Sequence, residues 1–284
     1  MAQQHTLPSN SLVPDHHTNQ TTVAIVGGGL AGLAAATVLA HEDVSVVLFE
    51  ARRQLGGRAG SFQLDDETDE IDHCQHVAMA CCTNFLDFCR RTGIERHFRR
   101  EKKLHFVGPS GERIDLAPPR FLPAPLHLAP FLFRLHYLTF SERLSVARAL
   151  LRLARYKSQE TESSPSMDQW LTDNGQTENA KELFWSVVLV SALGESLDRS
   201  SIAAARKVLV DGFMANRGAY QVDVPTLSLG ELYDGHVARH LENGGVAIRR
   251  ETVVRQIRHA SGGPLVELAD GTSHAFDYLI LAAP

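Results

Sequence analysis

Residues Thr21–Gly32 read TTVAIVGGGLAG, and this stretch decides the fold. Its first six residues form a short, apolar and β-branched run, which is typical of a buried parallel strand. Three glycines follow at once, and the alanine- and leucine-rich segment up to about His41 predicts a helix. Gly27, Gly29 and Gly32 have the spacing of GxGxxG, the pattern of a dinucleotide-binding turn between a strand and a helix.

Each of these glycines has its own mechanical role in such a turn. Gly27 permits the tight turn, Gly29 lets the backbone approach a pyrophosphate, and Gly32 lets the helix pack closely on the strand. The first helical turn, which contains Leu30 and Ala31, offers unpaired N–H groups and the positive end of the helix dipole to phosphates. A purely structural glycine turn is the alternative, but the complete strand–turn–helix–strand order favours a dinucleotide site.

The second strand of this unit is predicted at Val44–Phe49, and it ends in Glu50, 18 residues after Gly32. An acidic side chain at this place can accept hydrogen bonds from ribose hydroxyls, and its charge repels a 2′-phosphate. The unit therefore disfavours a cofactor with a 2′-phosphate, such as NADP, but it does not distinguish NAD from FAD.

The segment Glu50–Ser61 reads EARRQLGGRAGS and separates the two cofactors. It resembles the E-A-R-x-x-x-G-G-R segment of FAD-dependent amine oxidases and carotenoid desaturases, in which Ala51 would be the second residue. The resemblance implies that Gly57 lets the chain pass close to the flavin pyrophosphate, and that Arg52 and Arg58 support it. FAD is therefore the expected cofactor.

The composition excludes several classes of protein. The chain has 284 residues with 28 Lys+Arg against 33 Asp+Glu, a net charge of −5, which disfavours a nucleic-acid binder. No apolar run approaches the roughly 18 residues of a membrane-spanning helix. The cysteines lie within 74–89 without a CxxC pair, which predicts reduced thiols in a cytoplasmic protein, with a redox role for Cys81 and Cys82 as the alternative. Residues 1–20 are polar and predict a disordered tail rather than a secretory signal.

The order of predicted elements indicates an α/β protein with a discontinuous, Rossmann-like FAD-binding domain. Its first part is 21–75, and a mainly helical substrate domain follows over 76–225. Within that domain the sequence predicts helices at 83–91, 178–193 and 200–213, a hairpin of 103–107 with 113–116, and a helix at about 141–156 with the apolar stripe Leu144, Ala147, Leu151 and Ala154. A capping box at Ser228-x-x-Glu231 predicts the start of a further helix. Helical and strand patterns in 226–284 then resemble the part of flavin amine oxidases that returns to the first sheet. In that resemblance Val254 contacts the adenine through its backbone.

Two features of the middle of the chain leave alternatives open. Phe121–Arg155 combines prolines, large apolar residues and arginines, which fits either a membrane-dipping surface or an amphipathic helix packed on its own domain. Asp72 and His76 follow the cofactor-binding unit and are candidate catalytic residues, with a hydrogen-bonded pair that supports the loop as the alternative. His73 and His76 have no third ligand at useful spacing, so no metal site is predicted.

Several further motifs resemble the squalene-associated FAD-dependent desaturases, which are hydroxysqualene dehydroxylases. They include DHCQHV at 72–77 and LPAPLH at 122–127, and the resemblance runs from about Val23 to the end of the chain. Cys74 departs from the glycine usual there, which puts the local geometry near the flavin in doubt. The resemblance implies reductive removal of the hydroxyl of hydroxysqualene to give squalene. It also implies a lipid-soluble isoprenoid substrate, contact with the inner face of a membrane, and neighbouring enzymes of the squalene pathway.

Other functions remain open at this point. The chain could be a carotenoid (phytoene) desaturase-like or amine oxidase-like flavoenzyme, or a non-catalytic flavin-binding fragment. Members of this superfamily normally continue beyond the last strand of this sequence. We therefore expect the C-terminal part to be missing from these 284 residues, FAD binding to be weakened, and independent activity to be small.

Overall fold

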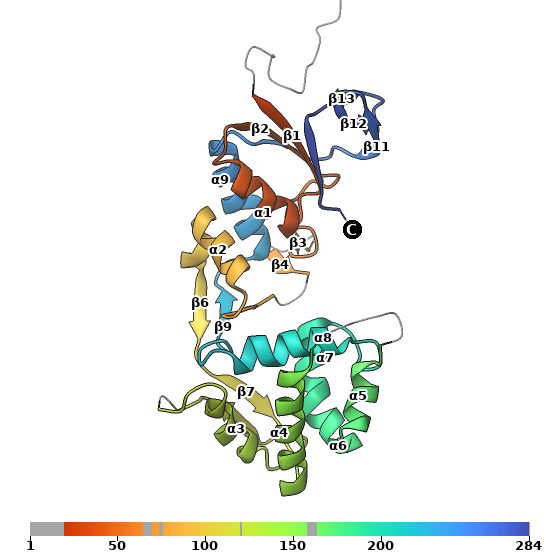
Figure 1. The fold of residues 1–284 in the computed structure, drawn as a ribbon. Coiled ribbons are helices and arrows are strands. Elements are labelled where there is room, and N and C mark those ends of the chain that lie inside the picture. Colours follow the sequence, from red (N-terminus) through yellow and green to blue (C-terminus); the bar gives the residue numbers. More distant parts are fainter. Residues whose placement is uncertain (1–19, 65–69, 74–75, 120, 158–163, 284) are drawn as a thin grey trace, which may run out of the picture. The chain divides into compact units, whose positions relative to one another are not determined.

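The chain divides into two compact units (Figure 1). The computed structural model describes residues 20–64, 70–73, 76–119, 121–157 and 164–283. Unit 1 is made of Met1–His76, Phe85–Phe98 and Pro225–Pro284, and unit 2 of Val77–Asn84 and Arg99–Val224. The predicted disorder of the tail and the departure at Cys74 lie outside the described residues.

A parallel sheet is the centre of unit 1. Its strands are arranged in the order β10-β2-β1-β14, with the bounds β10 (Ala247–Arg249), β2 (Val44–Phe49), β1 (Thr21–Val26) and β14 (Tyr278–Leu281). The bounds of β1 and β2 are the predicted ones. The return of the chain to this sheet is also confirmed, because β14 pairs in parallel with β1, with Val23 opposite Tyr278.

Alternate side chains of this sheet face two different layers. Ile25, Val46 and Leu48 are buried in a core with α1 (Leu30–Leu39), η5 (Glu231–Val237) and α9 (Ala238–Asn243). Ala24, Val47 and Phe49 are buried on the opposite face, against the antiparallel sheet β11 (Val254–Ala260), β12 (Gly263–Leu268) and β13 (Ser273–Ala275). Strand residues alternate between faces, so continuous apolar runs are needed where both faces are covered. The α/β fold class is therefore confirmed.

Residues 85–98 correct the predicted division of the chain. The sequence placed them in the inserted domain at 76–225, but they pack into unit 1 as most of α2 (Thr83–Thr92) and as η1 (Ile94–His97). Phe88, Cys89 and Ile94 are buried in the same core as Leu232. The reason is the apolar face of this short helix, which completes the helical layer of unit 1. A two-stranded sheet of β3 (Ser61–Gln63) and β4 (Glu70–Asp72) also lies in unit 1 and was not predicted.

Unit 2 is mainly helical. Its helical elements are η2 (Leu126–Leu128), α3 (Ala129–Arg134), α4 (Phe140–Arg155), α5 (Met167–Asp173), α6 (Glu178–Ala180), η3 (Lys181–Ser186), α7 (Val187–Leu193), α8 (Ile202–Arg206) and η4 (Lys207–Met214). Its strands are the predicted hairpin of β7 (Leu104–Val107) and β8 (Arg113–Leu116), and the sheet β5 (Ala78–Met79), β9 (Val222–Pro225) and β6 (Phe98–Glu101). The long helices predicted near 178–193 and 200–213 are present, but η3 and η4 give each a π-helical stretch.

A buried carboxylate fixes the start of α4 in unit 2. Thr139 and Glu142 form a capping box, in which the Thr139 amide donates to Glu142 Oε2 at 2.8 Å. The other oxygen, Oε1, accepts from Thr177 Oγ1 at 2.6 Å and from Asn179 Nδ2 at 3.1 Å. The Thr177 hydroxyl is the largest cause that lowers the pKa of Glu142, from its ordinary 4.5 to about 2. Glu142 therefore joins α4 to the loop before α6.

We expect unit 2 to lose stability as the pH falls from about 4.5 towards 2, because protonation of Glu142 removes an acceptor of four hydrogen bonds. A group whose pKa is lower in the folded state stabilises the fold above its unfolded pKa, and this contribution disappears in acid. Glu142→Gln should lower the free energy of unfolding by about 1–3 kcal/mol at pH 7 and flatten the acid dependence. Tryptophan fluorescence measures this, since Trp170 and Trp185 both lie in unit 2. An unchanged pH slope in Glu142→Gln would contradict the prediction.

Candidate cofactor site

The turn after β1 is held by close backbone contacts. Gly27 has φ 110°, and its amide donates to the Phe49 carbonyl at 2.8 Å. A Cβ at Gly27 would lie 2.7 Å from the Ala282 carbonyl oxygen, just after β14. A Cβ at Gly32 would overlap the carbonyl oxygen of Gly27. The fold itself therefore requires glycine at positions 27 and 32.

Gly29 differs from these two glycines, because the protein does not crowd it. Its backbone is extended, with φ −73° and ψ −179°, and a Cβ there would have no atom within 4 Å. Gly29 is the N-cap of α1, and no side chain caps the first turn, which includes Leu30 and the exposed Ala31. Open space in front of uncapped helical N–H groups fits a pyrophosphate.

Glu50, at the end of β2, is fixed by two backbone amides. Its Oε2 accepts from the Gly28 amide at 2.6 Å, and its Oε1 accepts from the Arg52 amide at 2.8 Å. A carboxylate has about four lone-pair sites, so Glu50 keeps capacity for a ribose hydroxyl. Gly28 is a further site residue that was not predicted, and a Cβ there would lie 2.5 Å from Leu55 Cδ2 and 2.9 Å from Glu50 Oε2. The signal was present, since a glycine fills the variable position between Gly27 and Gly29.

The double glycine of the second motif lies against the glycine turn. The Gly56 amide donates to the Gly28 carbonyl at 2.9 Å, and a Cβ at Gly57 would lie 3.2 Å from the Cα of Gly29. Arg52 and Arg58, on the same loop, are exposed and make no ion pair within the described part of the chain. The structure thus brings the two predicted motifs together, with the positive charges of Arg52 and Arg58 on the loop that borders the open space at Gly29.

A segment much later in the chain joins this site at the end of β2. The Glu50 amide donates to the Arg249 carbonyl, and the Thr252 amide donates to the Glu50 carbonyl, both at 2.9 Å. Val254, two residues after Thr252, is the half-buried first residue of β11. Ala51, the residue after Glu50, is exposed. The predicted adenine-contacting residue therefore lies in the segment next to the predicted ribose-binding acid.

Asp72 and His76 occupy different surroundings from the glycine turn. Asp72 Oδ1 accepts from Ser61 Oγ at 2.6 Å and from the Leu229 amide at 2.9 Å, and Ser61 Oγ accepts from the Gly230 amide at 2.7 Å. Asp72 thus holds the start of η5 through Ser61 and Leu229. His76 is half-buried. No group of three side chains suited to a metal ion occurs among the residues that the structure describes.

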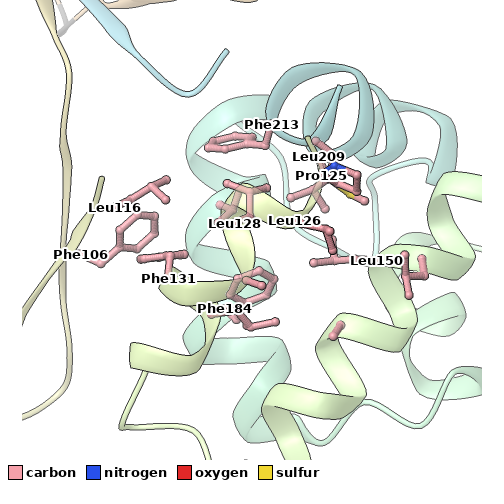
Figure 2. Close-up of a pocket in the computed structure, with 16 residues that line it drawn as sticks. Phe106, Leu116, Pro125, Leu126, Leu128, Phe131, Leu150, Phe184, Leu209 and Phe213 are labelled. Carbon is pink, nitrogen blue, oxygen red and sulfur yellow. The ribbon is translucent and has the colours of Figure 1, made fainter. Parts of the chain in front are cut away.

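Unit 2 contains a separate apolar pocket of about 180 Å³ (Figure 2). The residues around it come from β7, β8, η2 to α4, η3, α7 and η4, and all of them are apolar: Phe106, Leu116, Pro125, Leu126, Leu128, Ala129, Phe131, Leu132, Ala147, Leu150, Leu151, Phe184, Val188, Leu209, Phe213 and Met214. Such a pocket suits a hydrocarbon, because it offers burial without hydrogen-bonding groups.

The segment 121–155 contains the packed amphipathic helix, one of the two alternatives that the sequence left open. Val146, Ala149 and Leu153 bury one face of α4 in the unit's own core, which fits a packed amphipathic helix. Leu151, from the stripe that the sequence pattern singled out, is 47% exposed and borders the pocket. Within the described ranges, no helix has the length and apolar character needed to cross a membrane.

Comparisons with known proteins agree with this geometry. The family model described as "Flavin containing amine oxidoreductase" matches residues 30–284. A zeta-carotene desaturase of Capsicum annuum is 28% identical over 218 residues, which is 72% of this chain and 36% of that protein. A 15-cis-phytoene desaturase of Solanum lycopersicum is 25% identical over 281 residues, which is 94% of this chain and 47% of that protein.

A solved structure shares the fold. An oxidoreductase from Methanosarcina mazei superposes with a TM-score of 0.65 at 15% identity, covering 92% of this chain and 58% of that one. The chain thus spans between about a third and a half of the length of the two desaturases that it matches.

Proposed function

The chain belongs to the flavin containing amine oxidoreductase family, and we propose that the whole protein oxidises or reduces a long, lipid-soluble isoprenoid. Its cofactor is FAD, which supplies two-electron hydride chemistry when it is bound. The observation that carries the substrate class is the pocket in unit 2, whose lining is entirely apolar. It has no carboxylate that would hold an alkylammonium group, so it favours a hydrocarbon over an amine.

The chain's own residues have two tasks in this proposal. The uncapped start of α1 and the loop with Arg52 and Arg58 bind the phosphates, and Glu50 orients a ribose. The apolar side chains of the pocket bind part of the hydrocarbon and exclude water, because they offer a water molecule no hydrogen-bond partner. Exclusion of water protects a reactive carbon centre from side reactions.

Desaturation of a carotene-like polyene is the reaction that we propose first. The two desaturases that match the chain support it. In this reaction two C–H bonds on adjacent carbons break and a double bond forms between those carbons. One hydrogen would leave as a hydride, which FAD can accept when it is bound, and the other would leave as a proton to solvent or a basic side chain.

Reductive dehydroxylation of hydroxysqualene is the second candidate. The motifs at 72–77 and 122–127 support it, and the second motif contributes Pro125 and Leu126 to the pocket wall. The same motif contains His127, which is fully buried and whose ring nitrogens make no hydrogen bond of normal geometry. In this reaction hydride adds to carbon, and the hydroxyl leaves as water with a proton. Asp72 and His76 stay as the proposed residues for proton transfer, and association with other enzymes of the squalene pathway belongs to this candidate.

Two parallel incubations of the whole, FAD-loaded protein test the proposal. One contains ζ-carotene and a quinone as electron acceptor, and the other contains hydroxysqualene and chemically reduced flavin under anaerobic conditions. We expect a longer polyene in the first, seen as a red shift in absorbance; squalene in the second would favour dehydroxylation instead. Ala147→Phe, which fills the pocket, should lower turnover while FAD binding is unchanged. FAD binding without either product would indicate a non-catalytic flavin-binding fragment.

We also propose that the protein is cytoplasmic and contacts the inner face of a membrane through 121–155. This segment has five arginines and one glutamate in a chain of net charge −5. Leu126 is 59% exposed and, like Leu151, borders the pocket. Arg148 and Arg155, on the same helix face as Leu151, are exposed and form no ion pair among the described residues. Apolar side chains beside unpaired cations suit an anionic lipid surface.

Flotation with phosphatidylcholine vesicles, with and without phosphatidylglycerol, tests this contact. We expect binding that needs the anionic lipid, weakens with salt, and falls several-fold in Leu151→Glu. Val107→Glu is a matched control, since Val107 is 70% exposed in the same unit but does not line the pocket. Equal binding of the two variants would exclude this surface.

A further inference from the structure

Two segments that border the cofactor site are joined to each other by their backbones. One is the loop 50–58, and the other is the turn 249–252 between β10 and β11. Besides the two bonds of Glu50, the Glu251 amide donates to the Arg52 carbonyl at 3.1 Å. Glu251 has φ 54°, in the left-handed region. Among the residues that the structure describes, the others with positive φ are glycines. Such a conformation persists only where its surroundings hold it.

Asp234, a residue of η5, contacts both of these segments. Asp234 Oδ1 accepts from the Leu55 amide at 3.0 Å, immediately before the double glycine. The same oxygen accepts from Arg250 Nε at 3.1 Å, and Arg250 Nη2 also lies 3.1 Å from it. Arg250 immediately precedes the strained residue Glu251 in the chain. The side chains of Asp234 and Arg250 are only 26% and 30% exposed, so the ion pair is weakly screened by solvent.

The packing around Asp234 leaves this carboxylate little freedom. Leu232 and Tyr233, which precede it, are buried in the core together with Leu55. A Cβ at Gly56 would lie 3.5 Å from the Cβ of Tyr233, so η5 packs directly beneath the loop. η5 has π-helical geometry at this place, and π-helical turns often occur at functional sites.

We propose that Asp234, through Leu55 and Arg250, is a positioning residue that sets the distance between the 50–58 loop and the 249–252 turn for the adenosine diphosphate half of FAD. Asp234 acts on the shape of the site and not on the reacting atoms. A carboxylate suits this place better than an amide, because its negative charge strengthens the bond from the backbone amide and pairs with the guanidinium. The inference rests on the assignment of FAD as the cofactor, and it adds a residue that neither cofactor motif contains.

The test measures binding of ADP and of FAD to the 284-residue chain by titration calorimetry and flavin fluorescence. We expect Asp234→Ala to weaken both about tenfold, and the isosteric Asp234→Asn to lie between wild type and Asp234→Ala, because the amide oxygen can still accept from Leu55. Glu242→Gln is the matched control. It removes the other carboxylate near Arg250, at 3.4 Å, without touching the loop, and should change the affinity less than about twofold.

Hydrogen exchange of the free protein separates positioning from general stability. We expect faster exchange in 50–58 and 249–252 in Asp234→Asn, with β1 and α1 unchanged. Wild-type affinity in a folded Asp234→Asn and Asp234→Ala pair, or an equal loss in Glu242→Gln, would overturn the proposal. Should Asp234→Ala not fold, Asp234→Asn decides alone. Failure of the wild-type chain to bind either nucleotide would instead count against the cofactor assignment.

Discussion

Gly32→Ala is expected to prevent stable folding of unit 1. Alanine normally stabilises the interior of a helix by about 1 kcal/mol relative to glycine. Here the added Cβ would overlap the carbonyl oxygen of Gly27, so α1 must move away from the sheet. Gly32 and Leu33 are buried at this contact, and separation would open the core between α1 and β1. We expect a loss of at least about 3 kcal/mol, a large part of the stability of an ordinary domain.

Thermal unfolding followed by circular dichroism measures this loss. Gly262→Ala is a suitable control, because a Cβ at Gly262 has no atom within 4 Å and the residue lies in the β11–β12 turn. We expect this control to unfold at the wild-type temperature. A Gly32→Ala protein as stable as the control would show that α1 is not held at the distance found here.

In contrast to Gly32→Ala, the Gly29→Ala protein is expected to fold normally and to lose most of its affinity for FAD. Its backbone conformation is open to alanine, and the Cβ would enter space that holds no protein atom. That space lies in front of the uncapped N-terminus of α1, where a pyrophosphate must approach the backbone closely. We expect the dissociation constant for FAD to rise about 100-fold, which corresponds to about 2.7 kcal/mol.

Flavin fluorescence titration of Gly29→Ala beside Gly262→Ala measures this effect. The unfolding temperature of Gly29→Ala should stay close to that of the wild type, since neither side chain nor backbone of the protein is displaced. Wild-type FAD affinity in a folded Gly29→Ala protein would place the cofactor elsewhere. Together, the variants at 29 and 32 separate a glycine that the ligand needs from one that the fold needs.

Much of unit 1 could be predicted because its signals are local. The run at Thr21–Val26, the glycine turn and the acid at Glu50 lie within thirty residues, and each follows from conformational rules about neighbouring residues. The hairpin of β7 and β8 has the same property, as does the start of η5, where the Glu231 amide donates to Ser228 Oγ at 3.1 Å. The substrate could not be predicted in the same way. The motifs resemble those of hydroxysqualene dehydroxylases, whereas the two relatives described above are a zeta-carotene desaturase and a 15-cis-phytoene desaturase.

The parts that could not be predicted depend on partners far along the chain. The stripe Leu144, Ala147, Leu151 and Ala154 was visible in the sequence, but α4 buries Val146, Ala149 and Leu153 most deeply. Ala147 and Leu151 border the pocket instead. The pattern of residues 85–98 predicted a helix, but it did not indicate which of the two units this helix packs into. Packing energy is summed over many contacts, so it is decided only when both surfaces are in place.

Neighbouring residues along the chain were therefore enough to predict the α/β fold class and the glycines of the turn, and the resemblance of Glu50–Ser61 was enough to predict FAD. The folded structure was needed to show which of these glycines the protein crowds, as at Gly32, and which it leaves open, as at Gly29. It also decided that Asp234 reaches Leu55, 179 residues away, and that Glu142 accepts from Thr177. The physical reason is that conformational preference acts between neighbours in sequence, whereas crowding, burial and hydrogen bonding act between neighbours in space.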